Sequence, residues 1–367
     1  MKRRDFVKGS AALAGATSTG TFSLPHRASA ARVEAPVVDK LTMRVLIDSN
    51  HDQFLRPVQV NGVSHQPPGG GRGRDYRKVL HNQWGLSLFL ESQRSSELRT
   101  IMLDFGYSPD ALINNIEITG VDPSKAEALI VSHGHFDHFG GLQGFLAKYR
   151  SVLPADLKLY AGGEDNFCRR HTGQPNQLSE WGVLDRRELE AHKVTAVLCE
   201  TPTVIAGHAF TTGKIQRRSV ERVLPNTFVE YVMKDGLGCN ASHFTPAELQ
   251  GKIVPDEHIH EHATCFNIKD RGLVVISSCG HVGIVNSAQQ AREVSGVNKV
   301  HALVGGFHLG PAPKEYLDQV VAEIKALDPD VIIPMHCSGT NFIQAVREQL
   351  PSKLMVTSTG SRLTFGA

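Results

Sequence analysis

Short apolar runs separated by turn residues recur along the first half of the sequence. Apolar runs bounded by Gly, Pro, Asn or Asp predict buried strands, whereas apolar residues spaced three and four apart predict amphipathic helices. On this basis we predict strands over 43–49, 86–92, 99–106, 128–132 and 158–163, and helices over 109–118 and 141–150.

The last third of the sequence alternates regularly between the two patterns. Segments 263–269 and 273–279 flank the turn Asp270-Arg271-Gly272, which predicts a hairpin. Both halves begin with strands and end with alternating strands and helices, which predicts an α/β fold of two mixed sheets packed between outer helices. The elements predicted after the hairpin are helices over 284–295, 314–327 and 341–350 and strands over 300–306, 330–336, 353–358 and 361–366.

The middle of the sequence, 164–255, follows neither pattern clearly. Strand-like runs at 193–199 and 227–233 lie among polar loops, and no internal repeat is visible. We interpret 31–367 as a single domain in which 164–255 is a variable region near the pocket.

The N-terminal segment reads as a targeting signal rather than as part of the fold. Arg3 and Arg4 precede a mildly apolar stretch from Ala11 to Leu24, and "RASAA" offers a cleavage site after Ala30. This order resembles a twin-arginine export signal, whose arginine pair is read by the export machinery; the alternative is a disordered basic tail. The stretch is too short and weak for a stable membrane anchor. We therefore expect a soluble, periplasmic protein of 337 residues (367 − 30).

Charge and composition limit the classes of partner that the protein is expected to bind. Lys and Arg exceed Asp and Glu by only two (39 − 37), which argues against nucleic acid or an anionic membrane as a partner. The 18 histidines are many for this length and are clustered, which favours metal chemistry. The even number of cysteines, six, permits disulfides, but we assign none, and two of them, Cys279 and Cys337, adjoin candidate metal ligands.

The stretch "SHGHFDHFGGL" at 132–142 contains four residues that bind metals. It follows a predicted buried strand, and α/β folds place their sites at such strand ends. His133 and His135 can chelate one cation, while Asp137 and His138, at the start of the next helix, can point at a second. Imidazole and carboxylate suit Zn²⁺, Fe²⁺ or Mn²⁺. The alternative is a histidine-rich surface loop.

Three later strand ends each offer one further histidine. His281, His308 and His336 follow apolar runs and are flanked by Gly or Pro. One such histidine alone would be unremarkable, but three in the same context indicate a shared site.

These motifs carry a family resemblance. "HGHFDHFGG" resembles the first metal motif of the metallo-β-lactamase superfamily, whose fold is an αββα sandwich. "GLSLFLE", "IMLDFG", "SSCGHVGIVN", "GGFHLG" and "PMHCSG" resemble the branch of 7,8-dihydropterin-6-yl-methyl-4-(β-D-ribofuranosyl)aminobenzene 5'-phosphate synthases.

The resemblance implies two divalent metal ions, with zinc preferred and Mn or Fe as alternatives. It implies one metal on His133, His135 and His281, and a second on Asp137, His138 and His336. Asp104 would orient a ligand, although a strand-end turn role is equally open. The bridging aspartate of many superfamily hydrolases is missing from "VGGFHLG". Either His308 is then an additional ligand, or only solvent bridges the metals.

The chemistry that follows is hydrolytic. Bound metals would lower the pKa of a water and polarise a carbonyl or phosphoryl oxygen of a small, anionic substrate, with Asp137 also passing a proton. Export argues against the pterin-linked role of the branch. The alternatives are a metal-dependent sensor or binding protein and an iron-dependent redox protein.

Two polar patterns have a plainer interpretation. His258, His260 and His262 alternate within "DEHIHEHA", and we favour a solvated edge over a pocket or cation site. We also favour solvated faces over substrate attraction for the arginine pairs at 169–170, 186–187 and 217–218 and for the basic loop 66–75.

Overall fold

The computed structural model describes residues 31–68, 75–224, 227–249 and 253–366. The predicted export signal at 1–30 and most of the basic loop at 66–75 lie outside these residues. Within the described residues, no helix has the length and apolarity needed to cross a membrane.

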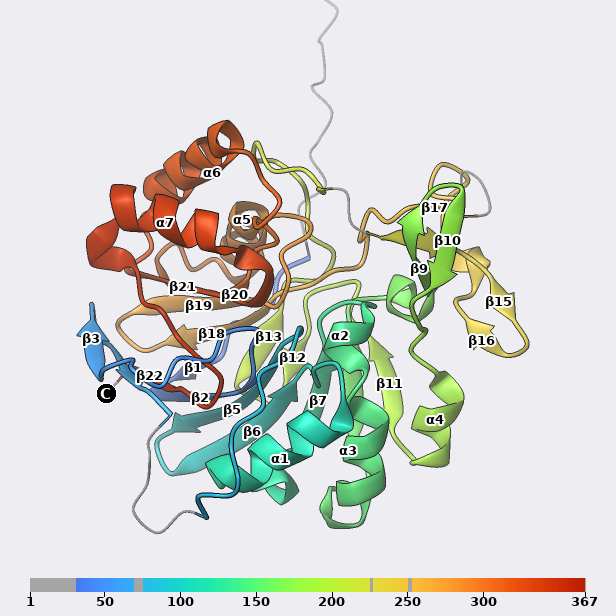
Figure 1. The fold of residues 1–367 in the computed structure, drawn as a ribbon, viewed down its shortest axis with the longest axis horizontal. Helices are drawn as coiled ribbons and strands as arrows, with labels where there is room; N and C mark the ends of the chain where they lie inside the picture. The colour runs from blue at the N-terminus through green and yellow to red at the C-terminus, as the bar shows by residue number, and fades with distance from the viewer. Residues whose placement is uncertain (1–30, 69–74, 225–226, 250–252, 367) are drawn as a thin grey trace, which may run out of the picture. The chain divides into compact units, whose positions relative to one another are not determined.

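Two large mixed sheets form the centre of the 31–367 unit (Figure 1). The first sheet has nine strands, parallel from β11 to β6 and antiparallel beyond. In order these are β11 (Thr195–Leu198), β8 (Lys158–Ala161), β7 (Ala128–Val131), β6 (Glu97–Leu103), β5 (Ser87–Arg94), β2 (Lys40–Ile47), β22 (Arg362–Gly366), β4 (Val63–Gln66) and β3 (Val58–Val60).

The second sheet has seven strands. Its hairpin of β18 and β19 is antiparallel, and β19, β20 and β21 are parallel, as the regular alternation of strands and helices requires. In order the strands are β12 (Val204–Ile205), β13 (Ala209–Thr211), β18 (Thr264–Ile268), β19 (Gly272–Ser277), β20 (Val300–Gly306) and β21 (Val331–Met335), with β1 (Val37–Val38) paired to β18.

Alternating side chains of the first sheet pack into two hydrophobic cores, one on each face of the sheet. Leu88 and Leu90 of β5 pack in the cluster that contains Phe266 of the second sheet, whereas Phe89 packs with Leu112 and Phe145 on the opposite face. Successive strand residues point to opposite faces, so a strand buried on both sides reads as one continuous apolar run.

The helices cover the outer faces of the two sheets (Figure 1). Helices α1 (Pro109–Thr119) and α3 (Leu142–Tyr149) lie on the first sheet, and α5 (Ile284–Ser295), α6 (Lys314–Leu327) and α7 (Thr340–Gln349) lie on the second. The layers are therefore helix, sheet, sheet and helix, which confirms the predicted α/β sandwich.

One predicted strand is wrong. Segment 353–358 makes only a single bridge, between Leu354 and Ile332, after a 3₁₀ turn that begins at Pro351. The hydroxyls that follow bond to an N-terminal loop instead: Ser358 Oγ accepts from Asp52 N at 2.8 Å, and Thr359 Oγ donates to Asp48 O at 2.9 Å. These side-chain bonds replace a strand ladder.

The middle region forms a small third sheet and contributes strands to both large sheets. β11 extends the first sheet, and β12 and β13 extend the second. A disulfide between Cys168 and Cys239, which the sequence analysis left unassigned, joins the start of this region to a segment 71 residues later, while the other four cysteines are buried thiols. The remaining elements are β9 (Arg169–Gln174), β10 (Gln177–Glu180), α4 (Arg186–Ala191), β14 (Phe228–Glu230), β17 (Val254–Pro255) and the hairpin of β15 (Met233–Lys234) and β16 (Leu237–Gly238).

Candidate metal centre

The predicted ligands all stand where a strand ends. His133 and His135 lie in the turn after β7, and Asp137 and His138 lie on the one-turn helix α2 (Phe136–Phe139). His281 and His336 follow β19 and β21 of the other sheet. Because the strand ends of both sheets meet at one edge of the sandwich, residues about 200 positions apart in the sequence converge.

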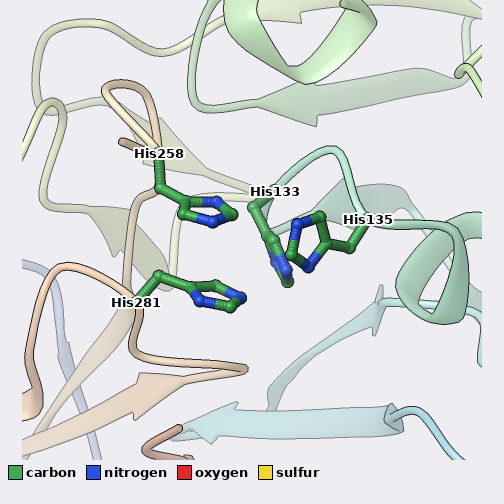
Figure 2. Close-up of side chains that lie close together, drawn as sticks. All are labelled: His133, His135, His258 and His281. Atoms are coloured by element: carbon green, nitrogen blue, oxygen red, sulfur yellow. The ribbon is translucent and has the colours of Figure 1, made fainter. Parts of the chain in front are cut away.

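Four imidazoles form the first cluster (Figure 2). One ring nitrogen from each of His133, His135, His258 and His281 lies within 4.8 Å of the others, and all four residues are buried. The ring centroids of His133 and His135 are 4.6 Å apart, and those of His135 and His281 are 4.7 Å apart.

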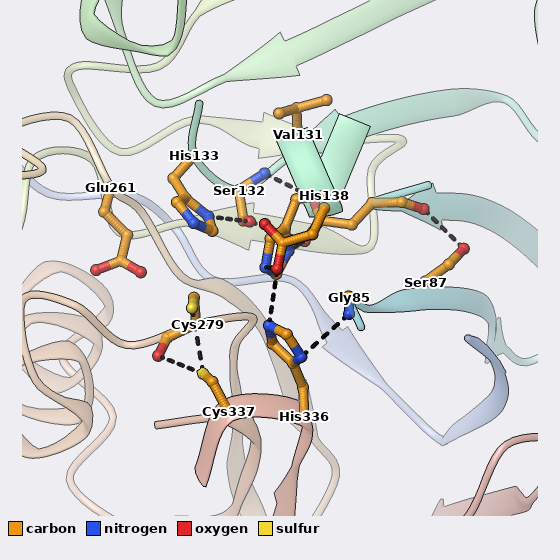
Figure 3. Close-up of polar contacts among 12 residues, drawn as sticks. Gly85, Ser87, Val131, Ser132, His133, His138, Glu261, Cys279, His336 and Cys337 are labelled. Carbon is orange, nitrogen blue, oxygen red and sulfur yellow. Dashed lines mark hydrogen bonds and ion pairs between the residues drawn. The ribbon is translucent and has the colours of Figure 1, made fainter. Parts of the chain in front are cut away.

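The second cluster consists of Asp137, His138 and His336. Figure 3 labels its two histidines. Asp137 Oδ2 lies 3.2 Å from His336 Nε2 and 3.8 Å from His138 Nε2. Ser49 Oγ lies 3.0 Å from the other ring nitrogen of His336, so the Nε2 edge faces Asp137. The structure therefore brings the predicted ligands together in the two sets that the resemblance implied.

Several atoms in these clusters are buried without a hydrogen-bond partner. They include His133 Nε2, His138 Nε2 and Asp137 Oδ1. Buried polar atoms are nearly always satisfied, so such a concentration points to a missing partner. Imidazole nitrogens and a carboxylate oxygen are donors that suit a divalent metal ion. The residues present thus fit a metal centre.

The electrostatics of the clusters favour a cation. Burial and the neighbouring histidines hold the pKa of His133 well below its usual value, and burial with His258 does the same for His281. Both are then neutral, the form that binds metal. Burial also lowers the pKa of His138, but Asp137 and Asp104 outweigh it and raise that pKa to about 9. The second cluster therefore stabilises positive charge.

Asp104 contacts the second cluster through the Nδ1 side of His138. Its Oδ2 lies 2.7 Å from His138 Nδ1, and its two oxygens accept from the backbone and hydroxyl of Ser132 at 2.8 Å each. A carboxylate on the far nitrogen of an imidazole fixes its orientation for metal binding. The geometry favours the orienting role over that of a simple turn residue.

Two thiols stand beside both clusters. Cys279 Sγ is 3.2 Å from Cys337 Sγ and 3.6 Å from His308 Nδ1. Cys279 lies within 4.8 Å of donors of both clusters, grouping with His133 and His138 and also with His336. His308 groups with Cys279 and His281 and not with Asp137. Sequence reasoning noted these thiols as neighbours of the ligands but did not treat them as candidate ligands.

Backbone strain concentrates at this site. Asp104, His258, His308 and His336 all have φ between 46° and 57°. Residues other than glycine rarely adopt this left-handed region, and those that do cluster at functional sites. Gly85 also has positive φ, and a Cβ there would come within 2.3 Å of Asp137 O. Only glycine lets this loop approach α2.

The solvated edge predicted for the alternating histidines is wrong. His258, His260 and His262 are all buried. His260 Nδ1 accepts from Asp165 N at 3.1 Å, and His262 Nε2 lies 3.1 Å from Val131 O. His258 lies in the first cluster itself, while His260 and His262 contact the other chain segments just named.

The solvated faces predicted for the arginine pairs hold only in part. Arg187, Arg217 and Arg218 are exposed, but Arg170 is fully buried. Arg170 Nε donates to Asp256 at 2.8 Å, and its Nη2 is 3.0 Å from Asp165. Asp165 is a near neighbour of Arg170 in the sequence, but Asp256 lies 86 positions away, so the local pattern could not reveal that pairing.

A cavity of about 190 Å³ adjoins the clusters. Both tryptophans of the chain line it. Trp84 makes an edge contact with His336 (ring centroids 4.7 Å apart), and Trp181 makes one with His135 (4.9 Å). The other lining residues are His135, Asp137, Thr172, Thr227, Cys279, His308, His336 and Cys337.

Comparison with known proteins agrees with this site. Residues 87–218, which include the first ligand motif, match the model of the metallo-β-lactamase superfamily. The 7,8-dihydropterin-6-methyl-4-(β-D-ribofuranosyl)-aminobenzene-5'-phosphate synthase of Methanocaldococcus jannaschii is 25% identical over 267 residues, covering 72% of this chain and 84% of the relative. An uncharacterized protein of the same organism is 26% identical over 268 residues, covering 71% of this chain and 86% of the relative.

A solved structure shares the fold. The crystal structure of Tm1679, a metal-dependent hydrolase of the β-lactamase superfamily, superimposes with a TM-score of 0.62 at 20% identity, covering 88% of this chain and 98% of that one. Residues 87–218 of this chain thus match the metallo-β-lactamase superfamily model, and the chain shares the fold of this solved hydrolase.

Proposed function

We propose that this protein is a metal-dependent, hydrolase-type enzyme that uses two divalent cations, preferably zinc, on a small anionic substrate. The observation that carries the proposal is the pair of buried donor clusters beside one cavity. His133, His135 and His281 would hold one cation, and Asp137, His138 and His336 the other. Bound cations of this kind lower the pKa of a coordinated water and polarise a substrate oxygen.

The chain's own residues would then position the substrate and move protons. Asp137 lines the cavity and has one carboxylate oxygen without a hydrogen-bond partner, so it can carry a proton as well as bind metal. Trp84 and Trp181 flank the cavity and exclude water from one side of the substrate. None of the described residues that line it is Lys or Arg, so attraction of an anion would fall to the cations.

The size of the cavity supports a small substrate. Its volume of about 190 Å³ is below the roughly 300–1,000 Å³ that is usual for drug-sized ligands. The synthase relative suggests a phosphorylated ribosyl compound as one class to test. Phosphoesters, lactones and β-lactams form the wider panel.

The test is metal content and turnover of the same samples. Mass spectrometry of the wild-type protein should find about two metals per chain, and metal-dependent turnover should appear on one member of the panel. Asp137→Ala should stay folded, lose one metal and lose turnover by at least about 10²–10⁴-fold, the contribution of a positioned acid or base. His192→Ala, at the half-buried C-terminal end of α4, is the matched control and should match wild type.

The outcomes separate the competing functions. Two metals without turnover of any panel member would favour the metal-dependent binding protein, which the missing bridging aspartate keeps in consideration. No metal, even after addition, would contradict the proposal. In the same assay, a loss of metal in His308→Ala would make His308 a ligand.

We also propose that residues 1–30 direct export through the twin-arginine machinery to the periplasm. The support is the order of charge, apolar stretch and small-residue site in the sequence. Replacing Arg3 and Arg4 by Lys should leave the chain in the cytoplasmic fraction. Unchanged periplasmic recovery would contradict the proposal.

A further inference from the structure

His258 comes from outside the predicted ligand motifs yet lies inside the first cluster. It stands in the loop between β17 and β18, and it is fully buried. One of its ring nitrogens lies within 4.8 Å of nitrogens of His133, His135 and His281.

The four rings converge from three separate segments of the chain (Figure 2). The centroid of His258 is 4.7 Å from that of His135 and 5.7 Å from that of His133. It is 3.7 Å from His281, and these two rings are nearly parallel, with 6° between their planes. Each imidazole therefore approaches the same small volume.

The loop that carries His258 is held firmly. The backbone N of His258 donates to Asp256 Oδ1 at 3.0 Å, and the other oxygen of Asp256 accepts from the buried Arg170. Four residues after His260 the loop joins β18 at Thr264, and Glu261 within the loop accepts from the backbone of His281 and Val282. His258 itself has φ of 48°, a conformation that persists only where the surroundings enforce it.

We propose that His258 is the fourth protein ligand of the cation held by His133, His135 and His281. This inference rests on the proposed function, because it requires that a cation binds there. Four imidazoles complete a tetrahedral shell, which leaves no position for water or substrate, as in structural zinc sites. The cation at Asp137, His138 and His336, with three protein ligands, keeps the open position.

The cavity agrees with this division of roles. It is lined by Asp137 and His336 of the second cluster but by only His135 of the first. A substrate in the cavity therefore meets two residues of the second cluster and contacts the first cluster only at His135. The first cation would hold the strand ends together, and the second would face the substrate.

Anomalous scattering from crystals of the zinc-loaded wild-type protein tests the ligand directly. We expect a zinc peak about 2.0–2.1 Å from a nitrogen of His258, as for a histidine ligand. A peak bonded to three imidazoles, with His258 beyond bonding distance, would overturn the proposal and leave His258 as a stacking partner of His281. This measurement needs no variant.

A variant tests the same proposal in solution. In His258→Asn the imidazole is lost, while asparagine tolerates the left-handed backbone. Chelator competition should show that one of the two zinc sites is weakened by at least about 10–100-fold, the loss typical of removing only an outer partner of a ligand. His262→Asn is the matched control, since His262 is a buried histidine of the same run outside both clusters.

The two failures are distinguishable. If wild type binds two zinc ions and His258→Asn binds them equally tightly, this inference fails and the proposed function stands. If wild type binds none, both fail.

Discussion

At the scale of single residues, the two tryptophans report on different clusters. Trp84 contacts His336 of the second cluster, and Trp181 contacts His135 of the first. A cation bound to an imidazole changes the electric field at the indole that touches it. The chain has no other tryptophan, so all of its tryptophan fluorescence comes from residues beside this site.

We therefore expect single-tryptophan variants to separate the two binding events. During a zinc titration, emission from Trp84→Phe should follow the first cluster, and emission from Trp181→Phe should follow the second. Steady-state fluorescence of the two variants checks this. Identical titration curves that are unchanged by Asp137→Ala would contradict the assignment.

Asp104 contacts His138 and is not one of the described residues that line the cavity. Asp104→Asn preserves the shape of the side chain and tolerates its φ of 57°, but it removes the negative charge beside His138. We expect the affinity of the second cluster for zinc to fall by about 10–100-fold, with the first cluster unaffected. Chelator competition on the metal-free protein measures both affinities. Equal loss at both clusters would indicate a general structural effect instead.

At the scale of elements, the strand ends that carry the ligands could be predicted from the sequence. The burial of the polar loop at 256–262 could not. β5, β6, β7 and the β18–β19 hairpin follow from apolar runs and turn residues, and with them came His133 and His281. Segment 256–262 has the same alternation that an exposed edge would have. Only its partners, such as Arg170 about 90 residues earlier, decide that it is buried.

The predicted strand over 353–358 failed for a related reason. Its apolar residues suited a strand, but hydroxyls of residues 358 and 359 bond to residues 48 and 52, more than 300 positions away. Single-sequence patterns contain no information on such partners. The middle region is harder still, because its short strands belong to four different sheets.

The disulfide makes a testable contribution to the middle region. It closes a loop across a sequence separation of 71 residues, between the start of β9 and the end of β16. Replacing both Cys168 and Cys239 by Ser should lower the free energy of unfolding by about 2–4 kcal/mol. Urea unfolding of the metal-free proteins measures the difference. Reductant should destabilise wild type by a similar amount and leave the double variant unchanged.

At the scale of the whole molecule, the ligands tie the two sheets to each other. The first cluster takes ligands from the strand ends of both sheets, and so does the second. A cation therefore bonds only to a chain in which both sheets have formed. Metal binding and global folding should be thermodynamically linked.

Chelation should consequently lower stability. At free zinc 100 times the dissociation constant, each site should add about 2.7 kcal/mol to the free energy of unfolding. Urea unfolding with zinc and with a chelator measures this contribution. In Asp137→Ala, the zinc-dependent gain in the free energy of unfolding should fall by the contribution of the second site only. A zinc-independent unfolding midpoint in wild type would contradict the linkage.

The pairing of β2 with β22 also determines how the molecule responds to mechanical force. These strands are antiparallel, and Lys40 lies opposite Gly366, so both leave the sheet at the same end. Tension applied between these two positions loads the hydrogen bonds between β2 and β22 one after another, starting at the Lys40–Gly366 end. A machine that pulls the chain at Gly366 therefore opens the ladders of β22 with β2 and with β4 pair by pair, instead of shearing all their hydrogen bonds at once.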